Sequence, residues 1–375
     1  MNHLNSTLLE ILQKNNYNIS TDTRKDISGS VYFALKGDNF DGSQFVQEAL
    51  DKGAVAVVTE DASKAGENVY IVENVLQSLQ ELSSAYRDLF TIPIIALGGS
   101  NGKTTSKELL KKTLGQKYKV HATEGSLNNH IGVPLSIFSM PRDTEIGIFE
   151  IGANHPNEHS ELLEILKPTH VVVTNNGMDH LEGFGSPEGS RRANKEIYDW
   201  AKGNGAKVFV HKGHTDLLED SSRTEQIVYP DYTLENTPGT FLSFICDDIS
   251  YTTQMIGSYN KENIELAVSI AEFFDVKRED TLRGIVDYAP SARRSQFMQK
   301  NNIDFIVDCY NANPTSMKLS LNSFLASNAP SKGVILGDML ELGEYADEEH
   351  KKVVESVLRL PLPLVYLLVI FSKKP

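Results

Sequence analysis

The stretch that decides the fold reads Leu97-Gly98-Gly99-Ser100-Asn101-Gly102-Lys103-Thr104-Thr105. It follows an apolar run at residues 94–97, typical of a buried strand, and opens a segment with helical periodicity at residues 103–114. Glycines let backbone N–H groups approach phosphate oxygens, and the N-terminus of a helix adds partial positive charge. The common pattern G-x-x-x-x-G-K-[ST] would need glycine at position 97, where this chain has Leu97, so the arrangement is related but different. We predict a phosphate-binding loop; a glycine-rich turn without a ligand is the alternative.

Two side chains of this loop suit the chemistry of a nucleotide. Lys103 can reach the β- and γ-phosphates of ATP, and Thr104 can coordinate Mg²⁺. The residues assigned to nucleotide binding on this motif are Gly99, Ser100, Asn101, Gly102, Lys103, Thr104 and Thr105.

Strands and helices alternate outward from the loop, which predicts an α/β fold with a mostly parallel sheet covered on both faces. The expected strands are 94–97, 146–150, 169–174 and 208–210, and the expected helices are 103–114 and 157–166. A small α/β domain precedes them, with strands at 31–35 and 54–58 and helices at 45–52 and 78–89. Behind them come a β-rich portion at 240–245 and 251–256, a helix at 261–274, and a third α/β unit with strands at 305–308 and 333–338. We expect domains at residues 1–82, 83–294 and 295–375.

The composition excludes several classes of protein. The chain has 375 residues, 40% hydrophobic and 23% charged, which suits a globular protein of two or three domains. A net charge of -14 argues against a nucleic-acid partner held through its phosphates. Two cysteines, Cys246 and Cys309, and a start without a basic or long apolar run predict a cytoplasmic protein without a signal peptide.

Residues 360–375 form an unusually apolar segment, Leu-Pro-Leu-Pro-Leu-Val-Tyr-Leu-Leu-Val-Ile-Phe-Ser-Lys-Lys-Pro. Its apolar part is shorter than the ~20 residues that a membrane-spanning helix needs. We predict a buried strand at 365–371, with a membrane anchor as the alternative, and no stable membrane insertion.

Single polar residues follow the ends of the expected strands. Glu150 ends one strand, and a carboxylate there can hold a Mg²⁺ that also touches nucleotide phosphates. His180 follows another strand within Asn175-Asn176-Gly177-Met178-Asp179-His180, and Asp308 ends a third. Each is a weak signal alone.

Taken together, these and further motifs resemble the Mur ligases. The matching stretches are 22–24, 34–37, 41–42, the phosphate loop, 128–135, 150–155, 180–186, 257–260 with Asn263, 294–296, 308–316 and 337–343. The resemblance runs from about residue 18 to about residue 358. Stretches 311–316 and 337–343 favour the branch that adds D-alanyl-D-alanine to UDP-N-acetylmuramoyl-tripeptide in peptidoglycan synthesis.

The resemblance implies a three-domain architecture: a small N-terminal α/β domain, a central ATP-binding domain with a P-loop-type sheet, and a Rossmann-like C-terminal domain. It implies that the precursor contacts Thr23, Arg24, Lys36, Asn128, Asn129 and His130. It places Asn260 and Asn263 by the adenine, and Arg294 and Asp308 over the phosphates and ribose. The implied magnesium ligands are Thr104, Glu150 and His180.

The chemistry implied by the resemblance begins with ATP phosphorylating the tripeptide carboxylate. The amine of the dipeptide then attacks the acyl phosphate. Because two anions meet in the first step, positive charge is needed from Lys103, Arg294 and Mg²⁺. The residues expected to act in catalysis are Lys103, His180, Arg294 and Asp308.

Two features depart from the family. Where members carry a lysine that CO₂ converts to a carbamate, two residues before a glutamate, this chain has Asn194, and Lys195 comes one position later. Adjacent helical residues point about 100° apart, so Lys195 cannot simply substitute without a shift. Either Asn194 is a neutral replacement, or Lys195 is used after a local adjustment, or activity is impaired; we favour the first. Family members also continue beyond the segment after Gly343, so we expect an incomplete third domain that lacks part of the dipeptide site.

Other functions stay open on the sequence alone. They are another Mur-type amide ligase or folylpolyglutamate synthetase, an impaired copy that binds nucleotide and precursor without turnover, and an NTPase acting as a mechanical switch. The resemblance suggests a monomer. It leaves the third residue of the acceptor peptide undetermined.

Overall fold

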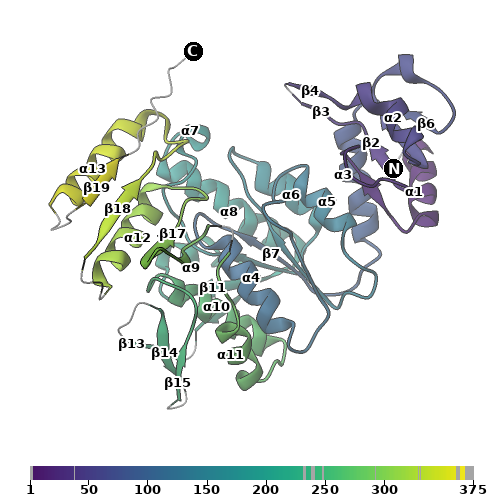
Figure 1. The fold of residues 1–375 in the computed structure, drawn as a ribbon. Coiled ribbons are helices and arrows are strands. Elements are labelled where there is room, and N and C mark those ends of the chain that lie inside the picture. Colours follow the sequence, from purple (N-terminus) through teal and green to yellow (C-terminus); the bar gives the residue numbers. More distant parts are fainter. Residues whose placement is uncertain are drawn as a thin grey trace.

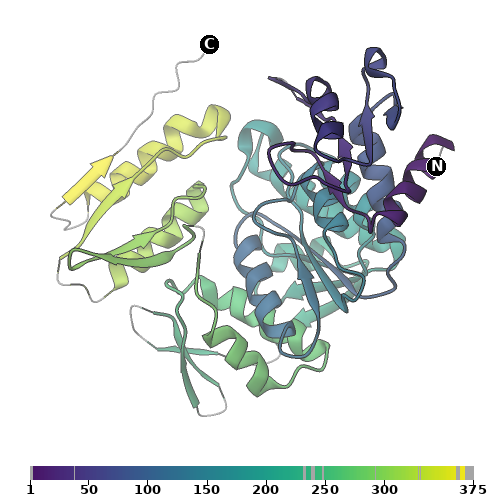
Figure 2. The same ribbon diagram turned by 45° about the vertical axis from the view of Figure 1, so that its right-hand side comes forward.

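The computed structural model describes residues 3–37, 39–230, 234–237, 241–246, 249–291, 293–327, 329, 331–359 and 364–367. Three regions follow one another along the chain (Figure 1). The N-terminal and C-terminal regions lie on opposite sides of the central one, as the turned view also shows (Figure 2). In the part of the chain just defined, no helix is long and apolar enough to cross a membrane.

The N-terminal region is a small parallel sheet with helices. Its strands run in the order β1-β2-β5-β6, all parallel, so the expected small α/β domain is present. Its elements are α1 (His3–Lys14), β1 (Ile19–Ser20), β2 (Val31–Phe33), β3 (Lys36–Gly37), β4 (Phe40–Asp41), η1 (Gly42–Phe45), α2 (Val46–Asp51), β5 (Ala56–Thr59), η2 (Ala62–Lys64), β6 (Val69–Ile71) and α3 (Val75–Arg87).

The central region is built on a six-stranded sheet of order β12-β11-β10-β7-β9-β8, in which every pairing is parallel. Its elements are β7 (Ile94–Gly98), α4 (Lys103–Leu114), β8 (Val120–Ala122), α5 (Gly132–Phe138), β9 (Ile146–Glu150), α6 (Glu158–Leu166), β10 (His170–Val173), α7 (Leu181–Phe184), α8 (Pro187–Asn204), β11 (Lys207–His211), α9 (Thr215–Asp220) and β12 (Glu225–Tyr229). The prediction of a mostly parallel sheet is confirmed.

Alternate residues of β7 enter two different cores. Ile94 and Ala96 belong to a core with α3, α5, α6 and α8, which also includes α1 and β2 of the N-terminal region. Ile95 and Leu97 belong to a second core with α4, α10 (Asn260–Phe273) and α11 (Arg278–Val286). Side chains along a strand point alternately to opposite faces, so a continuous apolar run here means a sheet covered on both sides.

A three-stranded antiparallel sheet, β13 (Glu235–Thr237), β14 (Ser243–Cys246) and β15 (Ile249–Thr252), precedes α10. The expected strand at 251–256 is wrong in its second half. The ladder with β14 ends at the Ser243–Thr252 pair, after which Thr253 Oγ1 donates to Leu242 O and accepts from Met255 N. Met255 is buried in the core beside α10 rather than in a strand.

The C-terminal region contains β16 (Gln296–Lys300), β17 (Ile303–Val307), α12 (Pro314–Ala326), β18 (Gly333–Leu336), η3 (Gly343–Tyr345), α13 (Ala346–Leu358) and β19 (Leu364–Leu367). β16 and β17 form a hairpin, and β18 pairs with β19 in parallel. The strand expected at 365–371 is therefore present at 364–367, and residues 368–371 lie outside the described residues. The suggested membrane anchor at 360–375 also falls mostly outside them.

Candidate nucleotide-binding site

The loop between β7 and α4 has the conformation that its glycines allow. Gly99 has φ of 110° and Gly102 has φ of 84°, a region that residues with a Cβ atom rarely adopt. A Cβ on Gly99 would lie 2.4 Å from Thr174 Oγ1, and one on Gly102 would lie 2.6 Å from Asn263 Oδ1. The loop is thus packed tightly between the end of β10 and the start of α10.

The segment after β10 already uses two backbone N–H groups of the loop. The Ser100 N–H donates to Asn175 O at 3.0 Å, and the Asn101 N–H donates to Asn175 Oδ1 at 3.1 Å. The first turn of a helix leaves N–H groups without an intrahelical acceptor. Because the Ser100 and Asn101 N–H groups are occupied, the N–H groups at the start of α4, beside Lys103 and Thr104, are the ones that the loop leaves for an anion.

Lys103 lies folded over its own loop. Its ammonium donates to the carbonyl oxygens of Gly99 and Ser100. These contacts keep the positive charge at the mouth of the loop, where an incoming phosphate would exchange with them. Thr105, the third residue of α4, is partly exposed.

Thr104 and Glu150 come together as the sequence predicts. Thr104 Oγ1 donates to Glu150 Oε2 at 2.8 Å, and Asn128 Nδ2 donates to Glu150 Oε1 at 2.9 Å. Glu150 is buried, with 1% of its surface exposed. A hydroxyl and one carboxylate beside a phosphate loop are the donors that a nucleotide-bound Mg²⁺ uses, so these residues fit that ion.

Lys107 was missed in the sequence. Its side chain is completely buried one helical turn after Lys103, and its ammonium donates to Thr123 O at 2.7 Å. It also lies 3.9 Å from Glu150 Oε2. The only signal in the sequence is its i+4 spacing from Lys103, which indicates the same helix face.

A second unpredicted group, Asp179, ties the loop to α8. Its Oδ1 accepts from Ser100 Oγ at 2.6 Å and from Ser190 Oγ at 2.8 Å, and Ser100 Oγ in turn accepts from the Gly177 N–H. Asp179 is buried. The Ser100 hydroxyl therefore holds the loop against Asp179 and Gly177.

His180 faces the C-terminal region. Its Nδ1 lies 2.5 Å from Glu341 Oε2, and the Glu182 N–H donates to Glu341 O at 2.9 Å. An apolar cluster of Leu181, Met339 and Leu342 packs beside this contact. His180 therefore lies at the junction of the two regions with Nδ1 engaged.

The residues expected near the adenine are buried and bonded to one another. Asn263 Nδ2 donates to Asn260 Oδ1 at 2.8 Å, and Asn263 Oδ1 accepts from Ser106 Oγ at 3.0 Å. Asn260 Nδ2 donates to Ile256 O. Asn263 thus connects α10 to α4 directly behind the phosphate loop, and Asn260 holds the Asn263 amide in place.

Two titratable groups flank the start of α10. A hydrogen bond donated by His214 Nε2 to Glu262 Oε2, at 3.1 Å, raises the pKa of His214 and lowers the pKa of Glu262. Burial raises the pKa of Tyr259 to about 12, so its hydroxyl stays protonated. It lies 2.5 Å from Ser295 Oγ.

Arg294 and Asp308 meet at the same junction. Asp308 accepts from the backbone N–H and the hydroxyl of Ser295, both at 3.2 Å. The Arg294 guanidinium lies 3.8 Å above the ring of Tyr310, whose hydroxyl donates to Ser126 Oγ. The structure places Arg294 beside the central region, stacked on an aromatic ring.

The residues expected to hold the precursor lie in two regions, the N-terminal and the central one. Thr23 is buried and Arg24 is exposed in an ion pair with Asp22, which lowers the pKa of Asp22 to about 2. Lys36 is exposed on the β3–β4 hairpin of the same region. In the central region, Asn128 joins Glu150, whereas Asn129 Oδ1 accepts from the Ile131 and Gly132 N–H groups and His130 is exposed.

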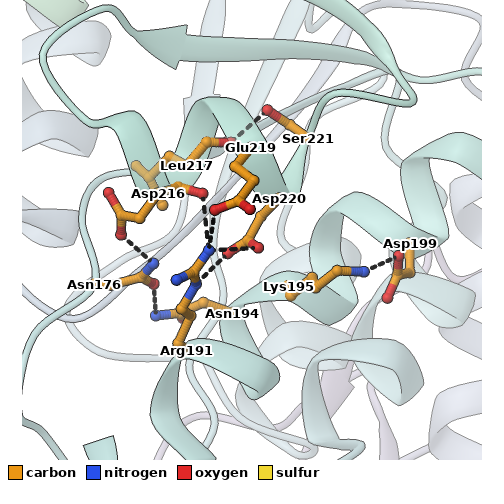
Figure 3. A network of polar contacts seen from close by, with 10 residues as sticks. All are labelled: Asn176, Arg191, Asn194, Lys195, Asp199, Asp216, Leu217, Glu219, Asp220 and Ser221. Atoms are coloured by element: carbon orange, nitrogen blue, oxygen red, sulfur yellow. Dashed lines mark hydrogen bonds and ion pairs between the residues drawn. The ribbon is translucent and has the colours of Figure 1, made fainter. Parts of the chain in front are cut away.

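The side chains of Asn194 and Lys195 point to different sides of α8. Asn194 Nδ2 donates to Asn176 Oδ1 at 2.9 Å, next to the segment that braces the loop, whereas Lys195 pairs with Asp199 at 2.6 Å on the outer face (Figure 3). The prediction that Lys195 cannot simply replace residue 194 agrees with this geometry.

Comparisons with known proteins match all three regions. Residues 16–89 match the family model described as Mur ligase family, catalytic domain. Residues 97–271 match the Mur ligase middle domain, and residues 293–368 match the Mur ligase, glutamate ligase domain.

Individual relatives are similar over most of this chain. The UDP-N-acetylmuramoyl-tripeptide–D-alanyl-D-alanine ligase of Bacillus subtilis is 32% identical over 350 residues, which are 90% of this chain and 76% of the relative. The crystal structure of MurF from Acinetobacter baumannii has a TM-score of 0.84 at 28% identity, over 96% of this chain and 85% of that one. MurF ligase from Thermotoga maritima in complex with ADP has a TM-score of 0.82 at 26% identity, over 100% of this chain and 86% of that one.

Proposed function

The chain belongs to the Mur ligase family, and we propose that it joins D-alanyl-D-alanine to UDP-N-acetylmuramoyl-tripeptide with hydrolysis of ATP to ADP and phosphate. One observation supports this proposal above the others: the C-terminal region contacts the phosphate loop itself. Asn313 Nδ2 donates to Asn101 Oδ1 at 2.9 Å. A dipeptide carried by the C-terminal region would therefore reach the γ-phosphate side of the loop.

The chain's own residues supply binding and charge. The N-terminus of α4 and Lys103 would hold the β- and γ-phosphates, while Asn260 and Asn263 would line the adenine side. Mg²⁺, held by Thr104 and Glu150, would neutralise negative charge on the transferred phosphoryl group. Arg294 would leave Tyr310 to approach the phosphates, and Asp308 would approach the ribose.

The reaction would proceed in two displacements. The tripeptide carboxylate oxygen forms a bond to the γ-phosphorus, and the bond to ADP breaks. The dipeptide amine then attacks the carbonyl carbon, loses a proton and expels phosphate. Closure of the C-terminal region onto the central one would exclude water, which would otherwise hydrolyse the acyl phosphate.

The precursor would extend from the N-terminal region to the central one. Thr23, Arg24 and Lys36 would bind its UDP end, and Asn128, Asn129 and His130 would contact its peptide side. The proposal retains domains at residues 1–82, 83–294 and 295–375, a monomer, and a cytoplasmic location, where ATP is available.

Phosphate release from ATP tests the proposal. The assay contains Mg²⁺ and UDP-N-acetylmuramoyl-tripeptide, with and without D-alanyl-D-alanine, and is repeated with the Lys103→Met variant. We expect release that needs both acceptor and dipeptide, matches peptide-bond formation one to one, and is lost in the variant. Release without any acceptor would overturn the ligase in favour of an NTPase. Binding of ATP and precursor without release would mean a copy that has lost turnover.

A further inference from the structure

Helix α8 presents two different faces beside the nucleotide site. Ser190 and Asn194, one turn apart, are both buried and face the segment after β10. Lys195 is rotated by about 100° from Asn194 and points outward to Asp199. The side chain nearest the phosphate loop at this level of the helix is therefore a neutral amide.

Asn194 belongs to a hydrogen-bond chain with a fixed direction (Figure 3). Asn176 Nδ2 donates to Asp216 Oδ2 at 2.7 Å, and Asn194 Nδ2 donates to Asn176 Oδ1 at 2.9 Å. A carboxylate only accepts, so Asp216 turns the NH₂ group of Asn176 toward itself and the carbonyl of Asn176 toward Asn194. The NH₂ group of Asn194 is thereby committed to Asn176, and its carbonyl oxygen accepts none of the hydrogen bonds found among the described residues.

Arg191 fixes the far end of this chain. Its guanidinium forms two hydrogen bonds with Asp220, at 2.8 and 2.9 Å, and a longer one with Asp216 O. This bidentate pair holds α9 against α8, so Asp216 at the first turn of α9 stays within reach of Asn176. Charged groups thus anchor the chain at its α9 end, and its other end is the neutral amide of Asn194.

The polar groups around Asn194 differ in charge from those around Glu150. Beside Thr104, a buried carboxylate offers an anionic oxygen for a divalent ion. Beside Asn194, Asp179 Oδ1 already accepts two serine hydroxyls, and His180 Nδ1 lies 2.5 Å from Glu341 Oε2. Across the described part of the chain, no three His, Cys, Asp or Glu side chains gather in a metal-binding group.

Magnesium binds strongly only where carboxylates or phosphates supply negative oxygens. An imidazole nitrogen and an amide oxygen carry no negative charge, so they do not replace an anionic ligand for this hard cation. The residues around Asn194 therefore do not fit a second divalent ion of the kind that a carbamate would help to hold.

We infer that this chain binds its nucleotide with one protein-held divalent ion, at Thr104 and Glu150, and that Asn194 is a positioning residue. Its amide supports Asn176 behind the phosphate loop and requires no CO₂. This inference rests on the proposed function only for the identity of the nucleotide.

Counting bound Mn²⁺ tests the inference independently of turnover. The full chain is saturated with a non-hydrolysable ATP analogue, and protein-bound Mn²⁺ is measured by electron paramagnetic resonance. We expect one ion per chain in the wild type and in the Lys195→Met control. Asn194→Asp, which adds a carboxylate of the same size, should raise the count toward two. Two ions in the wild type, or an unchanged count in Asn194→Asp, would overturn the inference.

Carbon-13 NMR in labelled bicarbonate tests the role of CO₂. We expect no lysine carbamate resonance from the wild type. A resonance that disappears in Lys195→Arg would mean that Lys195 turns inward and is carbamylated, and would overturn the inference. Neither measurement needs ligase activity, so a negative phosphate-release assay would leave these results interpretable.

Discussion

At the scale of single residues, Lys107 is a buried cation inside the nucleotide site, 3.1 Å from Glu108 Oε1 and 3.9 Å from the buried Glu150 Oε2. Lys107 has no exposed surface, and carbonyl oxygens of Thr123 and Gly125 accept from its ammonium. A buried charge is tolerated when it is paired and hydrogen-bonded, whereas removal of one partner leaves the other uncompensated.

We therefore predict that Lys107→Met lowers the free energy of unfolding by about 3 kcal/mol, the usual cost of breaking a buried pair. Lys111→Met, on the exposed side of the same helix, should change it by less than about 0.5 kcal/mol. Urea unfolding of both variants measures the difference. Equal effects would show that the pair with Glu150 does not stabilise the fold.

His159 couples stability to pH. It is buried below the phosphate loop, and its Nδ1 donates to Ala193 O at 3.0 Å. Burial lowers its pKa from 6.5 to about 4, with Lys103 also lowering it and Asp179 raising it. Between these values the unfolded chain binds a proton that the folded chain does not, so stability falls as pH falls from 6.5 toward 4.

For this single histidine the loss amounts to about 3 kcal/mol at the acid end. His159→Asn keeps a donor for Ala193 O and removes the titration, so its stability should depend less on pH within this window. His155→Asn, at an exposed position, should keep the wild-type dependence. Free energies of unfolding measured from pH 4.5 to 7 test this prediction. Parallel curves of free energy against pH for all three proteins would show that His159 does not cause the pH dependence.

At the scale of elements, α12 connects the C-terminal region to the phosphate loop. Its N-cap residue Asn313 uses both ends of its amide: Oδ1 accepts from the Ser316 N–H at 2.8 Å, and Nδ2 donates to Asn101 Oδ1 at 2.9 Å. Capping and docking thus depend on one side chain, and two substitutions can separate them.

Asn313→Ser should keep the cap and lose the reach to Asn101, whereas Asn313→Ala should lose both. We predict that both variants lower kcat/KM about 5–10-fold, the value of one hydrogen bond of about 1 kcal/mol in the closed state. Only the alanine variant should also lose about 1 kcal/mol of stability. Steady-state kinetics and thermal unfolding measure the two effects, and an unchanged kcat/KM in Asn313→Ser would exclude a role in docking.

How far the sequence predicted these elements depends on the type of signal. β7 and α4 were predicted nearly to the residue because an apolar run and a glycine loop mark both boundaries. The β16–β17 hairpin was only half predicted, although Asn301 and Asn302 at its turn have the positive φ that asparagine tolerates. Its strands are amphipathic and largely exposed, so no continuous apolar run marked them.

The contacts of the candidate site at the strand ends of the parallel sheet were predicted, and the contacts between a helix and a distant loop were missed. Thr104 and Glu150 follow from strand ends in a parallel sheet. The bonds of Asp179 to Ser100 and of Asn194 to Asn176 depend on how α8 is rotated against the β10 loop. Helical periodicity indicates which residues share a face, but it does not indicate which loop that face contacts.

At the scale of the whole molecule, apolar burial is unevenly distributed. Two large cores enclose the central sheet, and one of them continues into the N-terminal region. Among its described residues, the C-terminal region holds a small cluster around Leu321, Val334 and Val357, while Ile303 and Ile335 are more than half exposed. Its contact with the central region depends on a second small cluster, around Leu181, and on a few polar bonds.

This distribution predicts a graded pattern of hydrogen exchange, because amides exchange through local openings whose free energy follows the buried contacts they break. Strands β7, β9 and β10 should exchange most slowly, and the β16–β17 hairpin fastest. A non-hydrolysable ATP analogue given together with precursor should slow exchange at the start of α12, through its contact with the phosphate loop. Mass spectrometry of exchanged peptides resolves these segments. Slow exchange throughout the C-terminal region without ligands would mean that this region is held by more than the contacts described, and the docking role given to Asn313 would then lose its basis.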